Sequence, residues 1–299
     1  MTKPTHTPFY RQIIVLLRNA LSLLDEQGRK EVLEFLISQQ NPDGGFRDRG
    51  GQSDLYYSLF GGLMLRAAEK KAVDEKQEAV DRASIPELVE GAILNLKKFI
   101  AGQSNSNVPG FIEKCCLVLL QQEVKTGRNS QIKAFVALGK SFWKERHSIN
   151  ISYRSFVLFL TLEAALPVRK LLMIGAKRML RRSTIDQHSP CSEVAASVFL
   201  QKMMGQDGSE DQKLLKSFAR ESGGFKAFAH LDNADMLSTA VALFALNYAD
   251  CDLRLLKPIS LDFIGRNFAE GAFLSGDGDP TADVEYTFYG LLALGVLAD

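Results

Sequence analysis

The sequence lacks the features that mark several common protein classes. Its 299 residues include only four cysteines and one tryptophan. Cys115 and Cys116 are adjacent and the other two are isolated, so neither a disulfide framework nor a paired-cysteine zinc site is predicted. No apolar run reaches the roughly 20 residues that span a bilayer. The formal net charge of +1 provides no field to attract nucleic acid. We therefore expect a cytoplasmic globular protein without a nucleic-acid partner.

Three segments of the chain repeat one pattern. In each, a glycine-containing turn and a phenylalanine precede an aspartate by eight to ten residues, and a serine or threonine follows that aspartate by four. The copies are Gly44-Gly45-Phe46 with Asp54 and Ser58, Gly223-Gly224-Phe225 with Asp235 and Thr239, and Gly271-Ala272-Phe273 with Asp283 and Thr287. An aspartate at a helix start caps free backbone amides, and a residue four positions later lies on the same helix face. Each copy predicts an outer helix, a turn and an inner helix.

Weaker copies between these segments extend the pattern to about six helix pairs. Inner helices are expected to start near residues 54, 114, 152, 190, 235 and 283. Outer helices are expected near 28–40, 84–101, 129–146, 167–182, 209–220 and 256–268, with an additional helix near 9–24. We predict an all-α fold, an α/α toroid that closes as a ring. It forms one domain over 1–299, in which 1–27 is a helical extension and 28–299 carry the repeats. An open solenoid is the alternative.

The repeat, together with the sequence from Gln39 to Phe46, resembles the prenyltransferase and squalene-cyclase repeat superfamily. Members include β subunits of protein prenyltransferases and triterpene cyclases that act by protonation. The resemblance implies a central cavity suited to an isoprenoid chain. Aromatic residues on the expected inner helices are candidates to line it, and those chosen are Tyr57, Tyr153, Phe244, Tyr286 and Tyr289. The alternative is that these rings pack between the two layers of helices.

The residues fit the zinc-dependent transferases poorly. The resemblance implies an Asp, a Cys two residues later and a His from a following repeat as zinc ligands. Asp235 matches the first position, but Leu237 and Tyr286 occupy the others, and neither is a ready zinc ligand. Zinc is therefore not expected, and a helical α-subunit partner is expected only if this alternative holds.

The cyclases offer a closer match. Their Asp-x-Asp-Asp motif protonates an alkene or epoxide, and Asp283-Val284-Glu285-Tyr286-Thr287 resembles it with Glu285 at the proton donor's position. An acid facing an apolar cavity has its charged form disfavoured and can act as a general acid. We predict catalytic roles for Asp283, Glu285 and Asp235. The alternative is that Asp283 only caps the amino-terminal end of a helix and Glu285 only interacts favourably with the dipole of that helix. The residue two positions after the repeated aspartate varies from Tyr56 to Leu237 to Glu285, and only the last is an acid.

Several charged residues could contact the polar end of a substrate. Asp54, Arg47 and Arg49 are the candidates for binding it, and the two arginines are the better candidates for a diphosphate. The alternative for the arginines is a salt link to Asp48 or Asp54. Asp277 and Asp279 form an acidic turn that is a weak candidate for Mg²⁺, which would be needed only with a diphosphate. A basic run over 169–182 suggests peripheral contact with anionic lipid, or simply a solvated helix face.

The sequence thus predicts an isoprenoid-handling enzyme that cyclises or otherwise transforms a polyprenyl substrate after protonating it. Two alternatives stay open. One is a protein prenyltransferase β-subunit with incomplete zinc ligands. The other is a ring that binds lipid or acts as a scaffold without catalysis.

Overall fold

The computed structural model is mainly helical, with three short two-stranded hairpins among its described residues. It describes residues 8–69, 84–103, 108, 110–124, 138–142, 144, 151–165 and 185–298. The helical content confirms the predicted all-α class. The outer helix predicted at 167–182 lies outside the described residues, as does most of the one predicted at 129–146.

The predicted alternation of inner and outer helices is present in the described chain. The inner helices, apolar on nearly every side, are α3 (Leu55–Ala68), α5 (Phe111–Val124), α7 (Ile151–Ala165), α9 (Cys191–Met203), α11 (Met236–Tyr248) and α13 (Val284–Val296). The outer helices are α2 (Glu26–Ser38), α4 (Ser84–Gly102), α10 (Ser209–Ser217) and α12 (Leu256–Arg266). Each inner helix starts within a few residues of its predicted position, because the aspartate caps and apolar runs fix these boundaries.

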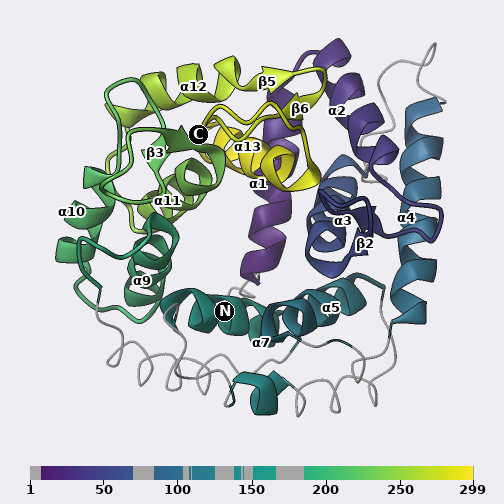
Figure 1. The fold of residues 1–299 in the computed structure, drawn as a ribbon, viewed down its shortest axis with the longest axis horizontal. Coiled ribbons are helices and arrows are strands. Elements are labelled where there is room, and N and C mark those ends of the chain that lie inside the picture. The colour runs from purple at the N-terminus through teal and green to yellow at the C-terminus, as the bar shows by residue number, and fades with distance from the viewer. Residues whose placement is uncertain are drawn as a thin grey trace, which may run out of the picture.

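The helices are arranged in two layers about a common axis (Figure 1). Each inner helix contacts the next one along the chain, and α13 contacts α3. The outer helices pack on the inner ones: α4 lies against α3 and α5, α10 against α9 and α11, and α12 against α13. This layering places the apolar faces of the inner helices toward one another and toward the outer layer.

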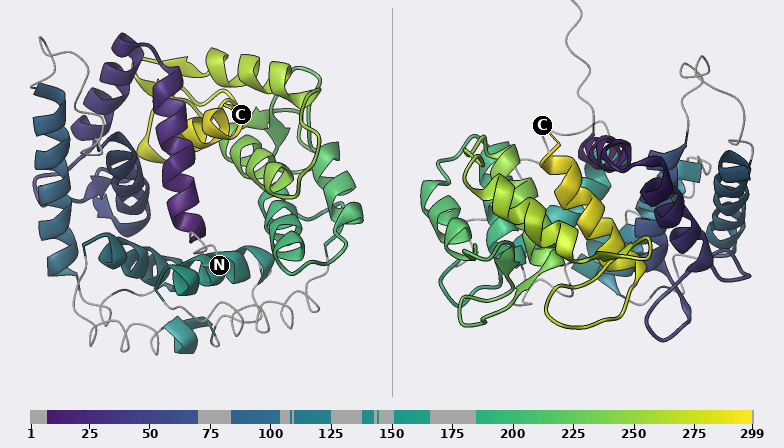
Figure 2. Two further views of the ribbon diagram at one scale, coloured as in Figure 1. Left: turned by 180° about the vertical axis from the view of Figure 1, so that it is seen from behind. Right: turned by 90° about the horizontal axis from the view of Figure 1, so that it is seen from above.

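Short antiparallel hairpins lead into three of the inner helices. They pair β1 (Phe46–Arg47) with β2 (Ser53–Asp54), β3 (Phe225–Lys226) with β4 (Ala234–Asp235), and β5 (Phe268–Ala269) with β6 (Ala272–Phe273). The loops that precede α3, α11 and α13 project on one side of the molecule (Figure 2). The amino-terminal ends of α3, α11 and α13 therefore meet on that side, which we call the mouth.

Hydrogen bonds explain why each of the three clear copies of the repeat contains an aspartate and a hydroxyl residue. The aspartate side chain accepts bonds from backbone amides of the helix it starts, and the copies are Asp54 with Tyr56 and Tyr57, Asp235 with Ser238, and Asp283 with Tyr286. The hydroxyl accepts a bond from the buried amide of the phenylalanine, and the pairs are Ser58 with Phe46 at 2.9 Å, Thr239 with Phe225 at 2.9 Å, and Thr287 with Phe273 at 3.3 Å. The pattern thus holds each hairpin on its inner helix.

The first glycine of each copy lies directly against an outer helix. Gly44 and Gly223 have positive φ angles of 91° and 93°. A Cβ atom on Gly44 would lie 2.1 Å from the carbonyl oxygen of Asn95 in α4, and one on Gly223 would lie 2.1 Å from that of Ile259 in α12. Gly271 packs in the same way, since a Cβ atom added to it would lie 2.3 Å from the carbonyl oxygen of Glu31 in α2. The last copy therefore abuts the outer helix of the first.

The helix predicted near 9–24 is present as α1 (Phe9–Leu23), in a position that its sequence did not reveal. It crosses the end of the inner helices opposite the mouth and contacts α13, α3 and α7 (Figure 2). The amide of Phe9 donates to Glu163 Oε2 of α7 at 2.9 Å, and Arg18 donates to the carbonyl of Ala67 at the end of α3. The helix is thus anchored at its start and near its middle.

Candidate functional site

A cavity of about 130 Å³ lies among the inner helices. All six of these helices and α1 contribute side chains to it, most of them apolar. Its aromatic lining consists of Tyr10, Tyr56, Phe60, Tyr153, Phe156, Phe199, Phe244, Phe288 and Tyr289. Three of the aromatic residues predicted to contact a substrate, Tyr153, Phe244 and Tyr289, are therefore at the cavity. The other two, Tyr57 and Tyr286, lie at the mouth, in contact with charged groups described below.

Glu285 lies at the mouth within a group of tyrosines. The hydroxyl of Tyr56 donates to Glu285 Oε1 at 2.9 Å, and that of Tyr57 is 3.4 Å from Oε2. The hydroxyls of Tyr56 and Tyr289 are 3.3 Å apart. We call Glu285, Tyr56, Tyr57 and Tyr289 the tyrosine–glutamate cluster. Because Tyr56 and Tyr289 also line the cavity, the cluster joins the carboxyl group to the apolar space.

The surroundings of Glu285 favour its neutral form. Burial raises its pKa above the ordinary value, and the negative charge of Asp283 acts in the same direction. The hydrogen bond from Tyr56 opposes this change because it stabilises the carboxylate. Burial also raises the pKa of Tyr56 and Tyr289 well above the ordinary value, so both hydroxyls keep their protons at neutral pH. The cluster therefore combines a carboxyl group whose pKa is raised with tyrosine hydroxyls that stay protonated and can donate hydrogen bonds.

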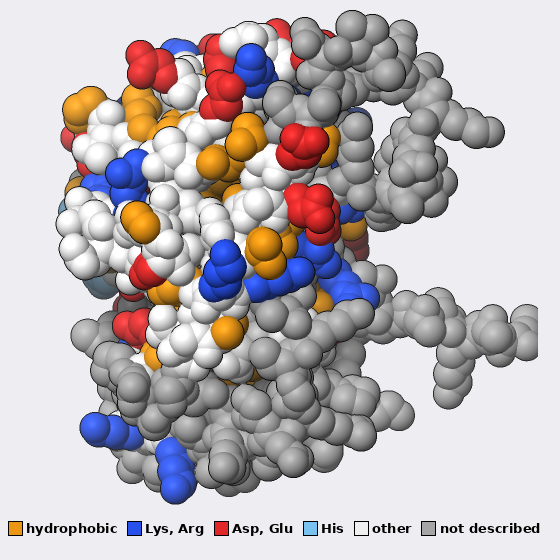
Figure 3. All heavy atoms as spheres, turned by 90° about the vertical axis from the view of Figure 1, so that its right-hand side faces the viewer, with side chains coloured by type: hydrophobic (Ala, Val, Ile, Leu, Met, Phe, Trp, Pro, Cys, Tyr) orange, Lys and Arg blue, Asp and Glu red, His pale blue; other side chains and the backbone are white. Residues whose placement is uncertain are grey.

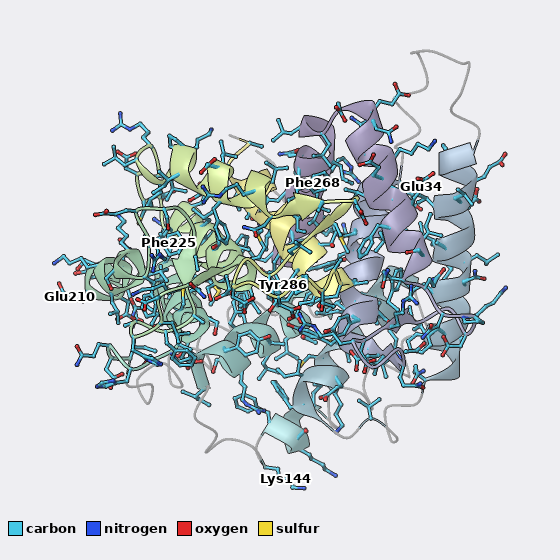
Figure 4. All side chains as sticks on the ribbon, turned by 45° about the horizontal axis from the view of Figure 1, so that its top comes forward. Glu34, Lys144, Glu210, Phe225, Phe268 and Tyr286 are labelled. Carbon is cyan, nitrogen blue, oxygen red and sulfur yellow. The ribbon has the colours of Figure 1, made fainter. Side chains whose placement is uncertain are left out.

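Arg49 joins the hairpin of the first repeat to the last repeat. Its Nε donates to Asp283 Oδ2 at 2.8 Å, and one terminal nitrogen lies 2.9 Å from Asp279 Oδ2. The guanidinium carbon is 5.3 Å from the ring centre of Tyr286, a distance suited to a cation–π contact. The Asp283 side chain is only 7% exposed, so this ion pair is partly shielded from water. Figure 4 shows the position of Tyr286 close to the start of α13. The charge of Arg49 is thus already matched by two carboxylates.

The remaining charged residues predicted for the site form hydrogen bonds with neighbouring backbone or side-chain groups. Arg47 donates to the side chain of Gln39 at 3.0 Å and to a carbonyl at the end of α2. Asp54 and Asp235 cap α3 and α11, and burial raises the pKa of Asp235. The structure therefore brings Arg49, Asp283 and Glu285 together at the mouth and engages Arg47 with the outer layer.

The acidic turn at 277–279 is held by its own hydrogen bonds. Asp277 accepts a bond from the hydroxyl of Ser275 and another from the amide of Asp279. Asp279 accepts a bond from the amide of Thr281 at 2.9 Å and pairs with Arg49. Within the described ranges, no three His, Cys, Asp or Glu side chains converge as a metal-binding set. The turn thus offers a pair of carboxylates whose oxygens are largely engaged.

The sequence did not single out Tyr56 as a partner of Glu285. Both residues stand two positions after a repeated aspartate, Tyr56 after Asp54 and Glu285 after Asp283. Equivalent positions on neighbouring inner helices face each other when α13 lies beside α3, as it does here. Aligning the repeat copies by their aspartates could therefore have predicted that Tyr56 and Glu285 meet. The position of Tyr10 at the cavity could not have been predicted in this way, because α1 is not part of the repeat.

No family model and no curated protein matches this chain. The resemblance to the prenyltransferase and squalene-cyclase superfamily therefore stays a prediction, and the site is interpreted from its own residues. No helix in the described part of the chain is both long and apolar enough to cross a membrane. Exposed Leu88 and Leu94 mark the outer side of α4, and Figure 3 shows hydrophobic side chains scattered among charged ones on that side of the molecule. The basic run at 169–182 lies outside the described residues.

Proposed function

We propose that this chain is a closed α/α toroid that binds an uncharged isoprenoid, or a similar apolar molecule, in its central cavity and protonates it with Glu285. Two contacts support closure of the ring. One is the packing of α13 against α3, and the other is the approach of Gly271 to the first outer helix, α2. Both join the last repeat to the first, as the earlier repeats join each other.

The position of Tyr56 carries the functional proposal. Tyr56 lines the apolar cavity and donates a hydrogen bond to Glu285, so a molecule in the cavity lies one tyrosine hydroxyl away from a half-buried acid. In the proposed step, protonated Glu285 gives its proton to a carbon–carbon double bond and becomes a carboxylate. Tyr56 and Tyr57 then stabilise that carboxylate by hydrogen bonding. The carbocation formed on the substrate faces aromatic rings, which attract positive charge. Loss of a proton from the cation back to Glu285 completes the cycle.

The charges at the mouth favour an uncharged substrate over a diphosphate. Arg49 already pairs with Asp279 and Asp283, and Asp54 and Asp235 add further negative charge at neighbouring helix starts. A diphosphate brought to this end of the inner helices would be repelled by these carboxylates. This is our reason for preferring a cyclase-like reaction to a transferase-like one. It also makes a bound Mg²⁺ unnecessary to the proposal.

The size of the cavity supports a second candidate, a carrier that binds without catalysis. A dry protein cavity of about 150 Å³ accommodates benzene, and the cavity here is about 130 Å³. It therefore accepts about one isoprene unit as it stands, and a longer chain needs additional space. Both oxygens of Glu285 also accept hydrogen bonds from tyrosines, as they would in a purely structural role.

Turnover assays separate the two candidates. The purified protein is incubated with uncharged isoprenoids of increasing chain length, and products are identified by gas chromatography with mass spectrometry. We expect Glu285→Gln to reduce turnover by about a hundredfold or more, because the general acid is lost, while ligand binding persists. Glu34→Gln, on the exposed side of α2, is the matched control and should retain activity. Equal turnover in wild type and Glu285→Gln would refute the acid role, and binding without turnover would favour the carrier.

A further inference from the structure

A second space lies against the outside of the cavity, on the face opposite the mouth. It is a groove of about 520 Å³ between α1 and α11. Its walls combine apolar and amide side chains, and they are Gln12, Val15, Leu16, Asn19, Phe244, Asn247 and Tyr248. Val15 is 46% exposed, so the groove faces solvent along α1.

Phe244 lies between this groove and the cavity. In the described part of the chain, it is the one residue that lines both spaces. Its ring stacks on that of Phe199, with centroids 5.7 Å apart and an interplanar angle of 13°. Phe199 also lines the cavity and stacks on Tyr248 of the groove, with centroids 4.3 Å apart. Phe244, which is half-buried, and the stacked pair Phe199–Tyr248 therefore lie between the two spaces, and Phe244 is the side chain that reaches both.

Two other boundaries of the cavity, the mouth and α1, are held by polar contacts. At the mouth, a molecule would have to pass the ion pairs of Arg49 and the hydrogen bonds of the tyrosine–glutamate cluster. Displacing α1 would break the bonds of Phe9 to Glu163 and of Arg18 to Ala67. It would also separate Leu16 from Gly295, whose missing side chain lets the two helices touch. Rotation of one phenylalanine about its side-chain bonds costs far less than either change.

We propose that Phe244 is the gate through which an apolar ligand reaches the cavity from the groove between α1 and α11. When its ring turns aside, the groove and the cavity become one path that ends at Tyr56 and Glu285. Such a path supplies the additional space that a longer isoprenoid needs, with the reacting end in the cavity and the tail in the groove. The identity of the ligand rests on the proposed function, whereas the route depends only on the geometry.

Exchange of a small apolar probe tests the route independently of any reaction. Fluorobenzene resembles benzene, which a dry cavity of about 150 Å³ accepts, and ¹⁹F exchange spectroscopy gives its association and dissociation rates. We expect Phe244→Ala to raise the association rate at least tenfold and Phe244→Trp to lower it. Phe156→Ala is the matched control, because it enlarges the cavity without lining the groove. It should change the affinity while leaving the association rate near that of wild type.

The proposal is overturned if Arg49→Ala, which loosens the mouth, accelerates association while Phe244→Ala does not. It is also overturned if Phe156→Ala and Phe244→Ala accelerate association equally, since cavity size would then explain both. Should Phe244→Ala fold poorly, Phe244→Leu and Phe244→Trp retain the test, with faster and slower association expected respectively. Absence of bound probe in wild type and all variants would refute the cavity as an apolar site and the gate with it. If the probe exchanges as predicted but wild type turns over no isoprenoid, or Glu285→Gln turns over as fast as wild type, only the acid role of Glu285 is contradicted.

Discussion

At the scale of single residues, the site depends on how the tyrosine hydroxyls meet one carboxyl group. Glu285 is weakened as an acid by burial, and the hydrogen bond from Tyr56 opposes that effect. The balance between these two influences sets the fraction of Glu285 that carries a proton at a given pH. Substitutions that remove one hydroxyl at a time reveal the balance directly.

Tyr56→Phe is expected to raise the pKa of Glu285 further. The variant removes a hydrogen bond of 2.9 Å that stabilises the carboxylate, while the ring and its burial are retained. Tyr57→Phe removes a longer contact, 3.4 Å, and should have a smaller effect in the same direction. Carbon-13 NMR of labelled glutamate carboxyl groups, assigned by comparison with Glu285→Gln, measures both values. An unchanged or lower pKa in Tyr56→Phe would show that the hydroxyl does not stabilise the carboxylate.

The raised pKa of Glu285 also predicts how stability depends on pH. In the unfolded chain the residue ionises near its ordinary pKa of 4.5, whereas in the folded protein it keeps its proton to higher pH. The folded state therefore binds more protons in this interval, and its stability falls as pH rises through it. Glu285→Gln lacks this loss, so its free energy of unfolding should increase relative to wild type between pH 4.5 and the folded pKa. Urea titrations at several pH values measure the difference, and a decrease would contradict the shift.

At the scale of elements, the repeated hydroxyl residue ties each hairpin to its inner helix. Sequence comparison predicted the helix starts because caps and apolar runs are local signals, and the structure places α3, α11 and α13 directly after Asp54, Asp235 and Asp283. It did not predict that the hydroxyl accepts a bond from the phenylalanine amide. That contact joins residues 12 to 14 positions apart, across the turn of the hairpin. Nor did it predict where α1 lies, since α1 has no repeat partner.

Thr239→Val tests the hydroxyl contact with little change in shape. The variant leaves the buried amide of Phe225 without its acceptor and should lower the free energy of unfolding by about 1–3 kcal/mol. Thr239→Ser keeps the oxygen and is the matched control, with a loss of less than about 1 kcal/mol, since little more than one methyl group is removed. Chemical denaturation measures both. Equal losses in the two variants would assign the effect to the methyl group and not to the hydrogen bond.

At the scale of the whole molecule, the proposed ring depends on contacts between the last repeat and the first. Arg49 reaches Asp283, Tyr56 reaches Glu285, and Gly271 touches α2. The number and spacing of helix pairs suggested closure, and the contact of α13 with α3 supports it. The meeting of Tyr56 with Glu285 could have been predicted only by assuming that the equivalent positions of the first and last repeats become neighbours.

Gly271→Ala is expected to destabilise the protein through the junction between α2 and the last repeat. Its new Cβ atom would lie 2.3 Å from the carbonyl of Glu31, in addition to the strain of a φ angle of 77°. Gly51→Ala is the matched control, because Gly51 has a φ angle of 83° but no heavy atom within 4 Å of the added Cβ. The control should lose about 1–2 kcal/mol from backbone strain, and Gly271→Ala about 1–3 kcal/mol more from overpacking. Equal losses would show that the junction contributes nothing to stability.

The central claim is that the cavity holds an uncharged apolar molecule beside Glu285. The most direct measurement is solvent extraction of protein purified gently from the cells that make it, followed by mass spectrometry of the extract. We predict a near-stoichiometric isoprenoid without a diphosphate, absent from a folded Ala196→Phe variant whose new ring fills the cavity. A diphosphate ester, or the same lipid at the same yield from Ala196→Phe, would contradict the account.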